Sequence, residues 1–440
     1  MKQLSSILIL CLVLLVSCGT KHNQEGLDAY FEGGLSNYNR QLTNVIVADI
    51  FTPPVASRIY AYSNVAAYEG IRFADASKES LVSKLNDLDK LSEPEAGKKY
   101  YYPLVSAVAF MNVGKALVFD LDKVEAIKSS MLTEVKDIGI DEAVYQNSVS
   151  FGEKLATEIL SWAAKDGYLR RTALPRYSVS DDAGRWRPTP PDYMEAIEPH
   201  WNTIRPFVLE SAGQFDPGLP TAFNIEKDSK FYEEAVEVYE TVNKLDDKQL
   251  EVAKFWDCNP NISHTKGHVM YFQQQISPGG HWMHIAAQVL EEEKADGVTA
   301  AETMSLLGVT IADAFISCWD QKYKSSLTRP ETYINNYIDQ DWEPILQTPA
   351  FPEHTSGHSV ASSAAATALT ELFGENYAFV DATEVPYGLP PRSFQSFWQA
   401  AEEAAISRLY GGIHYRPAIE LGVAQGKAVG GFVIKRLKSD

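Results

Sequence analysis

Positively charged side chains and histidines recur in three segments near the C-terminus, which read KYKSSLTRP (322–330), FPEHTSGHS (351–359) and SRLYGGIH (407–414). Arginine presents a planar fork of donors and lysine a compact positive charge, and both bind phosphate-like oxygens. Histidine titrates near neutral pH, so it can serve as a nucleophile, a metal ligand or an acid–base group. The three segments together predict a site for a tetrahedral oxyanion. Its candidate residues are Lys322, Arg329, Ser356, Gly357, His358, Arg408 and His414.

The spacing of apolar residues predicts where two of these cations lie. Lys322 continues the apolar stripe of a helix predicted at 299–324, and Arg408 continues the stripe of a helix predicted at 394–410. A positive charge on the apolar face of a helix points into the bundle, where it requires a partner. We therefore expect both cations to face one shared cavity.

A helix start adds backbone donors to this predicted cavity. Ser356 precedes a helix predicted at 357–373 and is a natural N-cap. The first N–H groups of that helix, including the N–H of Gly357, have no partner within the helix and are free to bind an anion.

The ordered set of residues resembles the signature of the superfamily that joins type 2 phosphatidic acid phosphatases to vanadium-dependent haloperoxidases. The family pattern is Lys-x6-Arg-Pro, Pro-Ser-Gly-His and Ser-Arg-x5-His-x3-Asp, and looser similarity to the haloperoxidase-like branch runs from 255–260 through 277–282. The resemblance implies that His414 is the nucleophile of a phosphatase or the ligand that binds vanadium, and that His358 is the acid–base group. It implies oxyanion contacts for Lys322, Arg329, Ser356, Gly357 and Arg408.

Two positions depart from the family pattern. Thr355 stands where the family has proline, and Ala418 stands where the family has the aspartate that orients the nucleophilic histidine. Glu420 is too close in sequence to His414 to be assigned as a replacement. If nothing replaces the aspartate, we expect a slow enzyme with an intact anion site, in which Ala418→Asp raises turnover.

Three classes of function fit these residues. A haloperoxidase would bind vanadate through His414 and oxidise a halide with hydrogen peroxide. A periplasmic or surface acid phosphatase would cleave a small phosphoester through a phosphohistidine intermediate at His414, with no cofactor. A catalytically weak lipoprotein would only bind the anion.

Aromatic residues beside the motifs favour the haloperoxidase. Trp319 and Phe351 match apolar positions that line the halide side of the pocket in chloroperoxidase-like members of the family, although ordinary packing of two aromatic rings is the alternative. Asp257 matches a pocket-wall segment in which a carboxylate pairs with a site arginine. A helix-end carboxylate in water is the alternative for Asp257.

The N-terminus predicts a lipoprotein signal peptide at 1–17. Lys2 precedes a short apolar run that ends in Leu-Val-Ser-Cys, a pattern typical of bacterial lipoproteins in which Cys18 is lipidated. The run is shorter than the ~20 residues that span a bilayer, so we expect contact with the membrane through the lipid anchor only. Gly19 follows, which favours the outer membrane, facing the periplasm or the outside. Residues 18–43 are predicted as a tether.

The rest of the chain predicts an all-α fold of helical bundles, of the haloperoxidase and acid phosphatase type, because strictly alternating apolar runs are nearly absent. We expect an N-terminal helical region at 44–240 and a C-terminal bundle at 241–440 that carries the site. A proline-rich excursion at 168–225 is expected to be ordered. Further helices are predicted at 54–74, 104–119, 123–138, 142–166, 229–242, 247–257, 283–293 and 417–437, and the loop 374–393 is expected to roof the pocket.

The net charge limits the possible binding partners, and the remaining cysteines and histidines are assessed as possible disulfide or metal sites. A net charge of −19 argues against nucleic acid, and the oligomeric state stays open. Cys258 and Cys318 are expected either as a disulfide or as two buried thiols, neither at metal-ligand spacing. His264, His268, His281 and His284 lack a carboxylate at ligand spacing, so a structural role is expected for most, with His281 near the pocket mouth. Arg392 is expected at the surface or at the substrate.

Overall fold

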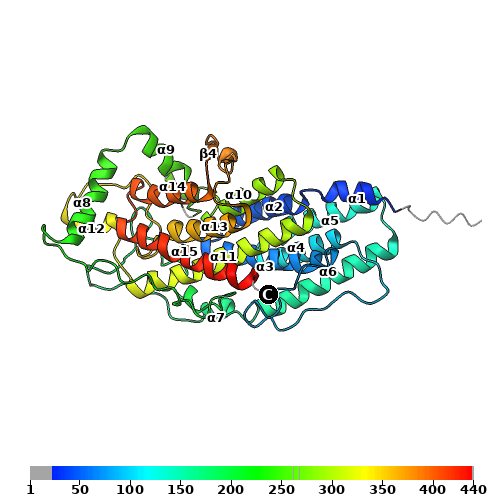
Figure 1. Ribbon diagram of the computed structural model, residues 1–440. Coiled ribbons are helices and arrows are strands. Elements are labelled where there is room, and N and C mark those ends of the chain that lie inside the picture. Colours follow the sequence, from blue (N-terminus) through cyan, green and yellow to red (C-terminus); the bar gives the residue numbers. More distant parts are fainter. Residues whose placement is uncertain (1–21, 261, 267, 439–440) are drawn as a thin grey trace, which may run out of the picture.

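Two long, buried helices form the centre of the molecule. In the computed structural model, which describes residues 22–438 except 261 and 267, α3 (Pro53–Ile71) packs along α11 (Gly297–Ser325) (Figure 1). Every residue of α3 is buried, because the helix is built from small and apolar side chains. Gly308 permits the close approach, since a Cβ there would lie 3.3 Å from the Cα of Ala61. The central pair thus packs backbone against backbone.

Helices account for nearly all of the remaining regular structure, which confirms the predicted all-α class. The other helices are α1 (Gln24–Phe31), α2 (Gly34–Ala48), α4 (Tyr102–Leu117), α5 (Leu121–Ile138), α6 (Glu142–Ala163), α7 (Tyr168–Arg171), α8 (Lys230–Asn243), α9 (Asp247–Phe255), α10 (Pro278–Glu292), α12 (Pro330–Tyr337), α13 (Gly357–Phe373), α14 (Phe397–Tyr410) and α15 (Arg416–Lys438). Short 3-10 turns are η1 (Arg72–Ala74), η2 (Trp201–Thr203) and η3 (Val385–Tyr387).

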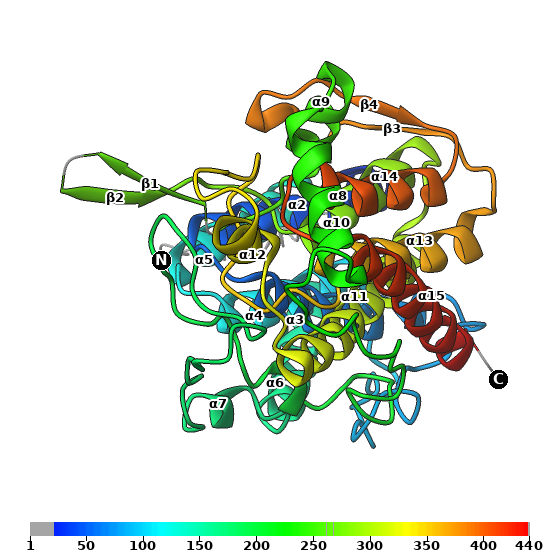
Figure 2. The ribbon, with the colours of Figure 1, turned by 90° about the vertical axis from the view of Figure 1, so that its left-hand side faces the viewer.

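Two short antiparallel hairpins complete the fold. In one, β1 (Ser263–Lys266) pairs with β2 (Val269–Phe272), and it stands out from one side of the body (Figure 2). In the other, β3 (Phe379–Asp381) pairs with β4 (Arg392–Phe394) within the loop that joins α13 to α14. The second hairpin lies against α10 and α14.

The helices gather at two ends of an elongated molecule. Figure 1 shows α1 and α4–α6 at one end and α8, α12, α14 and α15 at the other, with α3, α10 and α11 between them. The main apolar core runs from Leu27 of α1 to Leu437 of α15, and a second, smaller cluster packs α8 and α12 against α14 and α15. A domain boundary at residue 240 therefore stays a prediction. The site helices α11, α13, α14 and α15 all belong to this shared core or its edge.

Closely packed glycines join two of the site helices. Gly422, Gly426 and Gly430 of α15 face α13, and a Cβ at Gly426 would lie 2.2 Å from the carbonyl oxygen of Val360. The repeated glycines are therefore a contact between helices inside the protein. By length and composition α11 is the one described helix that could cross a membrane, yet 94% of its most apolar stretch is buried within the protein.

The proline-rich excursion is ordered, as predicted. Trp186 and Trp201 are almost fully buried. The carboxylate of Asp313 on α11 accepts three backbone N–H bonds from Phe207, Val208 and Leu209, at 2.6–3.0 Å. Buried backbone donors need partners, and this carboxylate supplies three of them at one point, so it fastens the excursion to the central helix.

Three sequence predictions about elements require correction. Residues 24–43, predicted as part of a tether, form α1 and most of α2, and Leu42 joins the core. The helix predicted at 283–293 begins five residues earlier, because Ser277 caps it and Pro278 occupies its first turn. The helix α12 was not predicted. The predicted signal peptide (1–17) and Cys18 lie outside the described residues.

Candidate functional site

Lys322 lies near the C-terminal end of α11 and is fully buried. Its Nζ donates to the backbone carbonyls of Thr355 at 2.6 Å and Pro352 at 3.1 Å, and it stands 4.8 Å from the centre of the Phe351 ring. No carboxylate lies within ion-pair distance of this amine among the described residues. Burial, with Arg329 nearby, lowers the pKa of Lys322 to about 7.

Arg329 precedes α12 and is also fully buried. Its Nε donates to the carbonyl of Phe351 and its Nη1 to the carbonyl of Ile413, both at 2.8 Å. Nη1 also lies 3.1 Å from Nε2 of His414. The other terminal nitrogen, Nη2, is buried with no hydrogen-bond partner in the described structure. A buried guanidinium nitrogen without a partner marks a place where an anion fits.

The segment between these two cations is held by the excursion. Ser326 adopts the left-handed conformation at φ 49°, and its carbonyl accepts from Trp186 N at 2.7 Å. Thr328 N donates to Gly184 O at 3.0 Å. These bonds fix the turn after α11 and so set the position of Arg329 relative to Lys322.

His414 is held between a carboxylate and an arginine. Its Nδ1 lies 2.8 Å from Oε1 of Glu353, an oxygen that also accepts from Tyr415 N at 2.9 Å. Arginine can only donate, so Nε2 of His414 must accept from Arg329 and the ring proton must sit on Nδ1. Burial and the neighbouring cations hold the pKa of His414 well below its usual value. The imidazole is therefore neutral, with its Nε2 lone pair facing the cations.

Glu353 replaces the carboxylate that the family motif places at Ala418. The expectation that His414 lacks a carboxylate partner is wrong, because Glu353 reaches it from a segment 61 residues earlier in the chain. Glu420, the other candidate, is exposed. Ala418 is itself buried, and its carbonyl accepts from Ser356 N at 3.0 Å. Burial raises the pKa of Glu353 to about 7, against the effect of Arg329 and Lys322.

The start of α13 supplies the third part of the site. Ser356 is the N-cap, and its Oγ accepts from Ser359 N at 3.3 Å. A Cβ at Gly357 would lie 3.7 Å from the Trp319 ring and 4.0 Å from Cε of Lys322. His358 is the second residue of α13, and its Nε2 is buried without a partner in the described structure. Burial, then Arg408, keeps the pKa of His358 well below its usual value.

Thr355, which replaces the family proline, is fully engaged. Its carbonyl receives the shortest Lys322 bond, and its hydroxyl donates to Gln425 of α15 at 2.7 Å. The substitution therefore ties the motif loop to α15.

Arg408 lies at the end of α14 and faces the C-terminal end of α9. Its Nη2 donates to the carbonyl of Trp256 at 2.7 Å, and its Nε donates to Ser407 Oγ at 3.0 Å. Cations stabilise the free carbonyls at a helix C-terminus. Asp257 follows, partly exposed, and makes no ion pair with Arg408 within 4.0 Å in the described structure. Burial nevertheless raises the pKa of Asp257 to about 6, against the effect of Arg408.

These residues converge on one pocket. Its lining includes Asp257, Trp319, Phe351, Gly357, His358, Arg408 and His414. Lys322 and Arg329 contact the lining residues Trp319, Phe351 and His414. Ser356 directly precedes the lining residue Gly357. Trp319 and Phe351 form one wall, with ring centres 5.0 Å apart. The indole N–H of Trp319 donates away from the pocket, to Ile197 O, so the aromatic faces offer an apolar wall.

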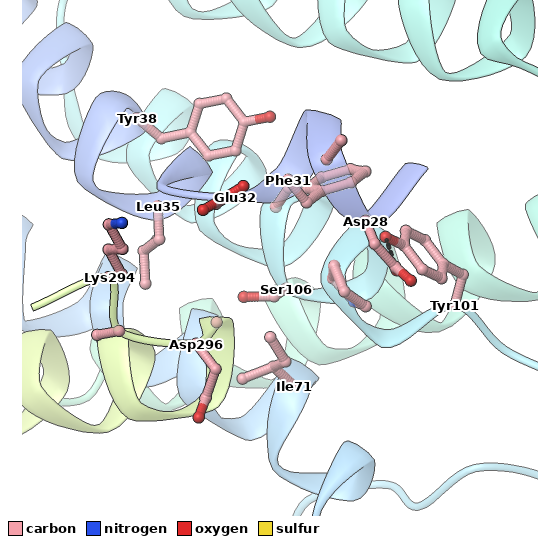
Figure 3. Close-up of a pocket in the computed structure, with 15 residues that line it drawn as sticks. Asp28, Phe31, Glu32, Leu35, Tyr38, Ile71, Tyr101, Ser106, Lys294 and Asp296 are labelled. Atoms are coloured by element: carbon pink, nitrogen blue, oxygen red, sulfur yellow. Dashed lines mark hydrogen bonds between the residues drawn. The ribbon is translucent and has the colours of Figure 1, made fainter. Parts of the chain in front are cut away.

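A larger pocket of about 530 Å³ lies elsewhere, between α1, α2, α4 and the start of α11 (Figure 3). Its charged groups include Asp28, Glu32, Lys294 and Asp296, and its lining holds no histidine, cysteine or arginine among the described residues. Size alone does not make a site, and the chemistry predicted from the sequence gathers in the smaller pocket.

Several other sequence candidates are engaged elsewhere. Arg392 forms a bidentate pair with Glu403, both bonds at 2.8 Å. Cys258 and Cys318 are free and buried, which settles the open question of a disulfide. His264 is exposed and His284 is partly buried, and neither belongs to a group of metal-ligating side chains in the described structure. His281 does, and is described below.

The residues present fit a tetrahedral oxyanion such as vanadate. Arg329 Nη2 and His358 Nε2 are buried without partners, and Gly357 leaves open the space beside Lys322. His414 lines the same pocket and is neutral, as a metal-ligating histidine must be. The cations supply the charge that a buried anion requires.

Comparison with known proteins agrees with this geometry. A family profile described as the vanadium chloroperoxidase second helical-bundle domain (VCPO_2nd) matches residues 335–439. The chain is 46% identical to a protein whose structure is described as the first bacterial vanadium-dependent iodoperoxidase, with TM-score 0.86, covering 94% of this chain and 98% of the other. A bacterial vanadium-dependent chloroperoxidase in its holo form shares the fold at 15% identity and TM-score 0.68, covering 89% of this chain and 93% of the other. A comparison with curated protein sequences finds no match.

Proposed function

The chain belongs to the vanadium-dependent haloperoxidases, and from this premise we propose that it is an iodide-oxidising enzyme whose vanadate is held by the pocket around His414. The observation that carries the proposal is the neutral His414, oriented by Glu353 and facing the buried cations through Nε2. A phosphatase has no comparable support from the comparisons.

The buried cations and the N-terminus of α13 would bind the anion. Arg329 offers its unpartnered Nη2, and the first N–H groups of α13 point away from their own helix. Lys322 and Arg408 donate to backbone carbonyls, so each can turn toward an anion without losing a charged partner. Vanadate held by these residues would supply the Lewis acidity that makes a peroxide oxygen electrophilic toward a halide.

Proton handling falls to His358 and Asp257. His358 has an unpartnered Nε2 in the pocket, so it can accept a proton from hydrogen peroxide as the peroxide enters. Asp257 lines the same pocket, is partly exposed and has a pKa near 6. It can therefore exchange protons with solvent near neutral pH and return one to the product.

The aromatic wall and the 46% identical relative support iodide as the halide. Iodide is the largest, least tightly hydrated and most easily oxidised of the three common halides. An approach along the faces of Trp319 and Phe351 strips water from the ion and offers few hydrogen bonds in exchange. That wall penalises chloride more than bromide, and bromide more than iodide.

Halide competition tests the proposal. We expect kcat/KM for peroxide-dependent oxidation to fall in the order iodide, bromide, chloride, with vanadate present throughout. Trp319→Ala should raise the rate with bromide relative to the rate with iodide, because the apolar wall is lost. As a control, Tyr193→Ala at an exposed position should leave this ratio of rates unchanged. Chloride oxidised as well as iodide by the unaltered protein would contradict the assignment.

We propose further that the protein is a lipoprotein of the cell envelope, anchored through Cys18. It would act on halide and hydrogen peroxide outside the cytoplasm. The signal-peptide pattern at 1–17 supports this proposal. Mass spectrometry of the mature N-terminus should find a diacylated Cys18. The Cys18→Ala variant should be absent from the membrane fraction. An unprocessed N-terminus in both proteins would refute the anchor.

A further inference from the structure

Four buried side chains meet behind the active-site pocket. Cys258 follows α9, His281 lies in the first turns of α10, and Asp381 and Glu384 belong to the loop that contains β3 and β4. Each is at most 4% exposed. They come from three segments that are far apart in the chain, so no spacing in the sequence could reveal the group.

Three of these side chains point ligand atoms at a common centre. His281 Nδ1 lies 3.4 Å from Cys258 Sγ and 3.0 Å from Glu384 Oε1, and Sγ and Oε1 are 4.0 Å apart. Zinc bonds of about 2.3 Å to sulfur and about 2.0–2.2 Å to nitrogen or oxygen, at tetrahedral angles, place such atoms roughly 3.3–3.6 Å apart. Shifts of a few tenths of an ångström would admit one ion.

The histidine is held as metal-binding histidines are held. His281 Nε2 lies 2.6 Å from Asp381 Oδ2, which leaves Nδ1 directed at Cys258 and Glu384. A carboxylate on the far nitrogen fixes the tautomer and orientation of a ligating imidazole. Trp256 stacks on the ring, with centres 4.7 Å apart and planes 22° from parallel, and so restrains its rotation.

We propose that Cys258, His281 and Glu384 bind a zinc ion, at a site that adjoins the vanadate pocket through Cys258. A mixed set of thiolate, imidazole and carboxylate donors suits zinc, whereas magnesium and calcium prefer oxygen alone. A divalent ion would replace the thiol proton and the proton between His281 and Glu384, and would balance one thiolate and one carboxylate. The three ligands leave a fourth position for water.

The ion would join the loop 374–393 to the wall of the vanadate pocket. Cys258 lines the vanadate pocket next to Asp257, while Glu384 belongs to the loop 374–393 above α10 and α14. Zinc coordination would thus fix the Asp257 carboxylate relative to Arg408 and hold the loop 374–393 against α10 and α14. This role is structural and does not depend on the halide proposed above.

Metal analysis of the full-length protein tests the site without reference to activity. Protein dialysed against buffer with micromolar zinc and without vanadate should retain one zinc per chain. Cobalt exchanged for zinc should give a thiolate-to-cobalt charge-transfer band. Cys258→Ser should lose the band and most of the zinc, whereas Cys318→Ser, at the other buried cysteine, should keep both.

Spectroscopy of the unaltered protein keeps the test decisive if a variant fails to fold. Absence of zinc and of a cobalt–thiolate band in the unaltered protein would overturn the proposal, and would show that a protonated His281 between Asp381 and Glu384 fills the cluster. A band that persists in Cys258→Ser would overturn it too. Glu384→Gln should weaken zinc retention but keep the thiolate band at saturating cobalt.

Discussion

Both ring nitrogens of His414 have defined partners, Glu353 on Nδ1 and Arg329 on Nε2. This arrangement makes Glu353 a positioning residue for His414, the histidine that we propose binds vanadium. Glu353→Gln keeps the size of the side chain but removes its charge, so the imidazole loses the carboxylate that stabilises positive charge. We expect activity to fall about 10–100-fold, mainly in kcat, with a smaller change in KM for the halide.

The exposed Glu420, four residues beyond the start of α15, offers a matched control. Glu420→Gln removes the same kind of charge from a side chain only six residues after His414 in the chain, and it should leave the kinetics unchanged. Undiminished kcat in Glu353→Gln, or an equal loss in Glu420→Gln, would show that another group orients His414.

Lys322 predicts a specific pH dependence of vanadate binding. Its pKa is about 7 in the buried site, whereas Arg329 has a pKa of about 10. Below pH 7 the amine is already charged. Above pH 7 binding must draw in one proton, so affinity should fall by up to about tenfold per pH unit relative to a variant without the amine.

The measurement compares vanadate affinity in the unaltered protein and in Lys322→Met, so that the ionisation of vanadate itself cancels. The vanadate affinity of the unaltered protein divided by that of Lys322→Met should be constant below pH 7 and should decline above pH 7. A ratio that stays flat through pH 9 would mean that Lys322 remains charged or takes no part in binding.

At the level of single residues, sequence patterns found the cations and histidines but missed Glu353. The motif residues carry fixed spacings, and these predicted a common pocket. Glu353 lies within the FPEHTSGH segment, beside the motif, and only the fold brings it to a histidine 61 residues later. The pairing of Cys258 with Glu384 is equally nonlocal.

Among the helices, the contact between α13 and α15 depends on glycine. Gly426→Ala would force a Cβ to 2.2 Å from the Val360 carbonyl oxygen, and overpacking of this kind destabilises by about 1–3 kcal/mol. Gly431 is on the same helix and a Cβ there meets nothing within 4 Å. Gly431→Ala should therefore stabilise the protein by about 0.5–1 kcal/mol.

Thermal or denaturant unfolding measures both variants under the same conditions. Opposite signs for the two alanines are the expected result. Equal changes in the two would show that helix propensity outweighs packing at this contact.

At position 418, the fold makes the aspartate of the family motif unnecessary. Ala418 is buried in the first turn of α15, and Glu353 already occupies Nδ1 of His414. Ala418→Asp would bury a second carboxylate without a new cation, at a cost of about 2 kcal/mol or more. We expect a lower melting temperature and no gain in kcat. A higher kcat in Ala418→Asp would instead support the expectation from the sequence that His414 lacks an orienting carboxylate.

Helix boundaries were predictable where capping residues mark them. The helix α13 spans 357–373 as expected, because Ser356 caps its start and Gly374 follows its end. The start of α10 was missed because Pro278 and the two glycines after it resemble a loop, although Pro favours a first helical turn. The helices α1 and α2 were missed because polar side chains dominate the segment.

For the whole molecule, the pocket is cationic while the chain carries a net charge of −19. Lys322, Arg329 and Arg408 are each almost completely buried, and the carboxylate of Glu353 is directed at His414. Such a group of buried cations is stable only if an anion completes it or if their pKa values fall. The account therefore assigns the pocket to a bound oxyanion, and the fold assigns the oxyanion to vanadate chemistry.

Titration of activity with orthovanadate tests this claim most directly. Full-length protein freed of bound anion is assayed for iodide oxidation by hydrogen peroxide while vanadate is added, and the same preparation is assayed for hydrolysis of p-nitrophenyl phosphate. We predict that oxidation is absent without vanadate, rises until one vanadium is bound per chain, and is suppressed competitively by phosphate. No halide oxidation at saturating vanadate, together with phosphate-ester hydrolysis by the same protein, would contradict the account.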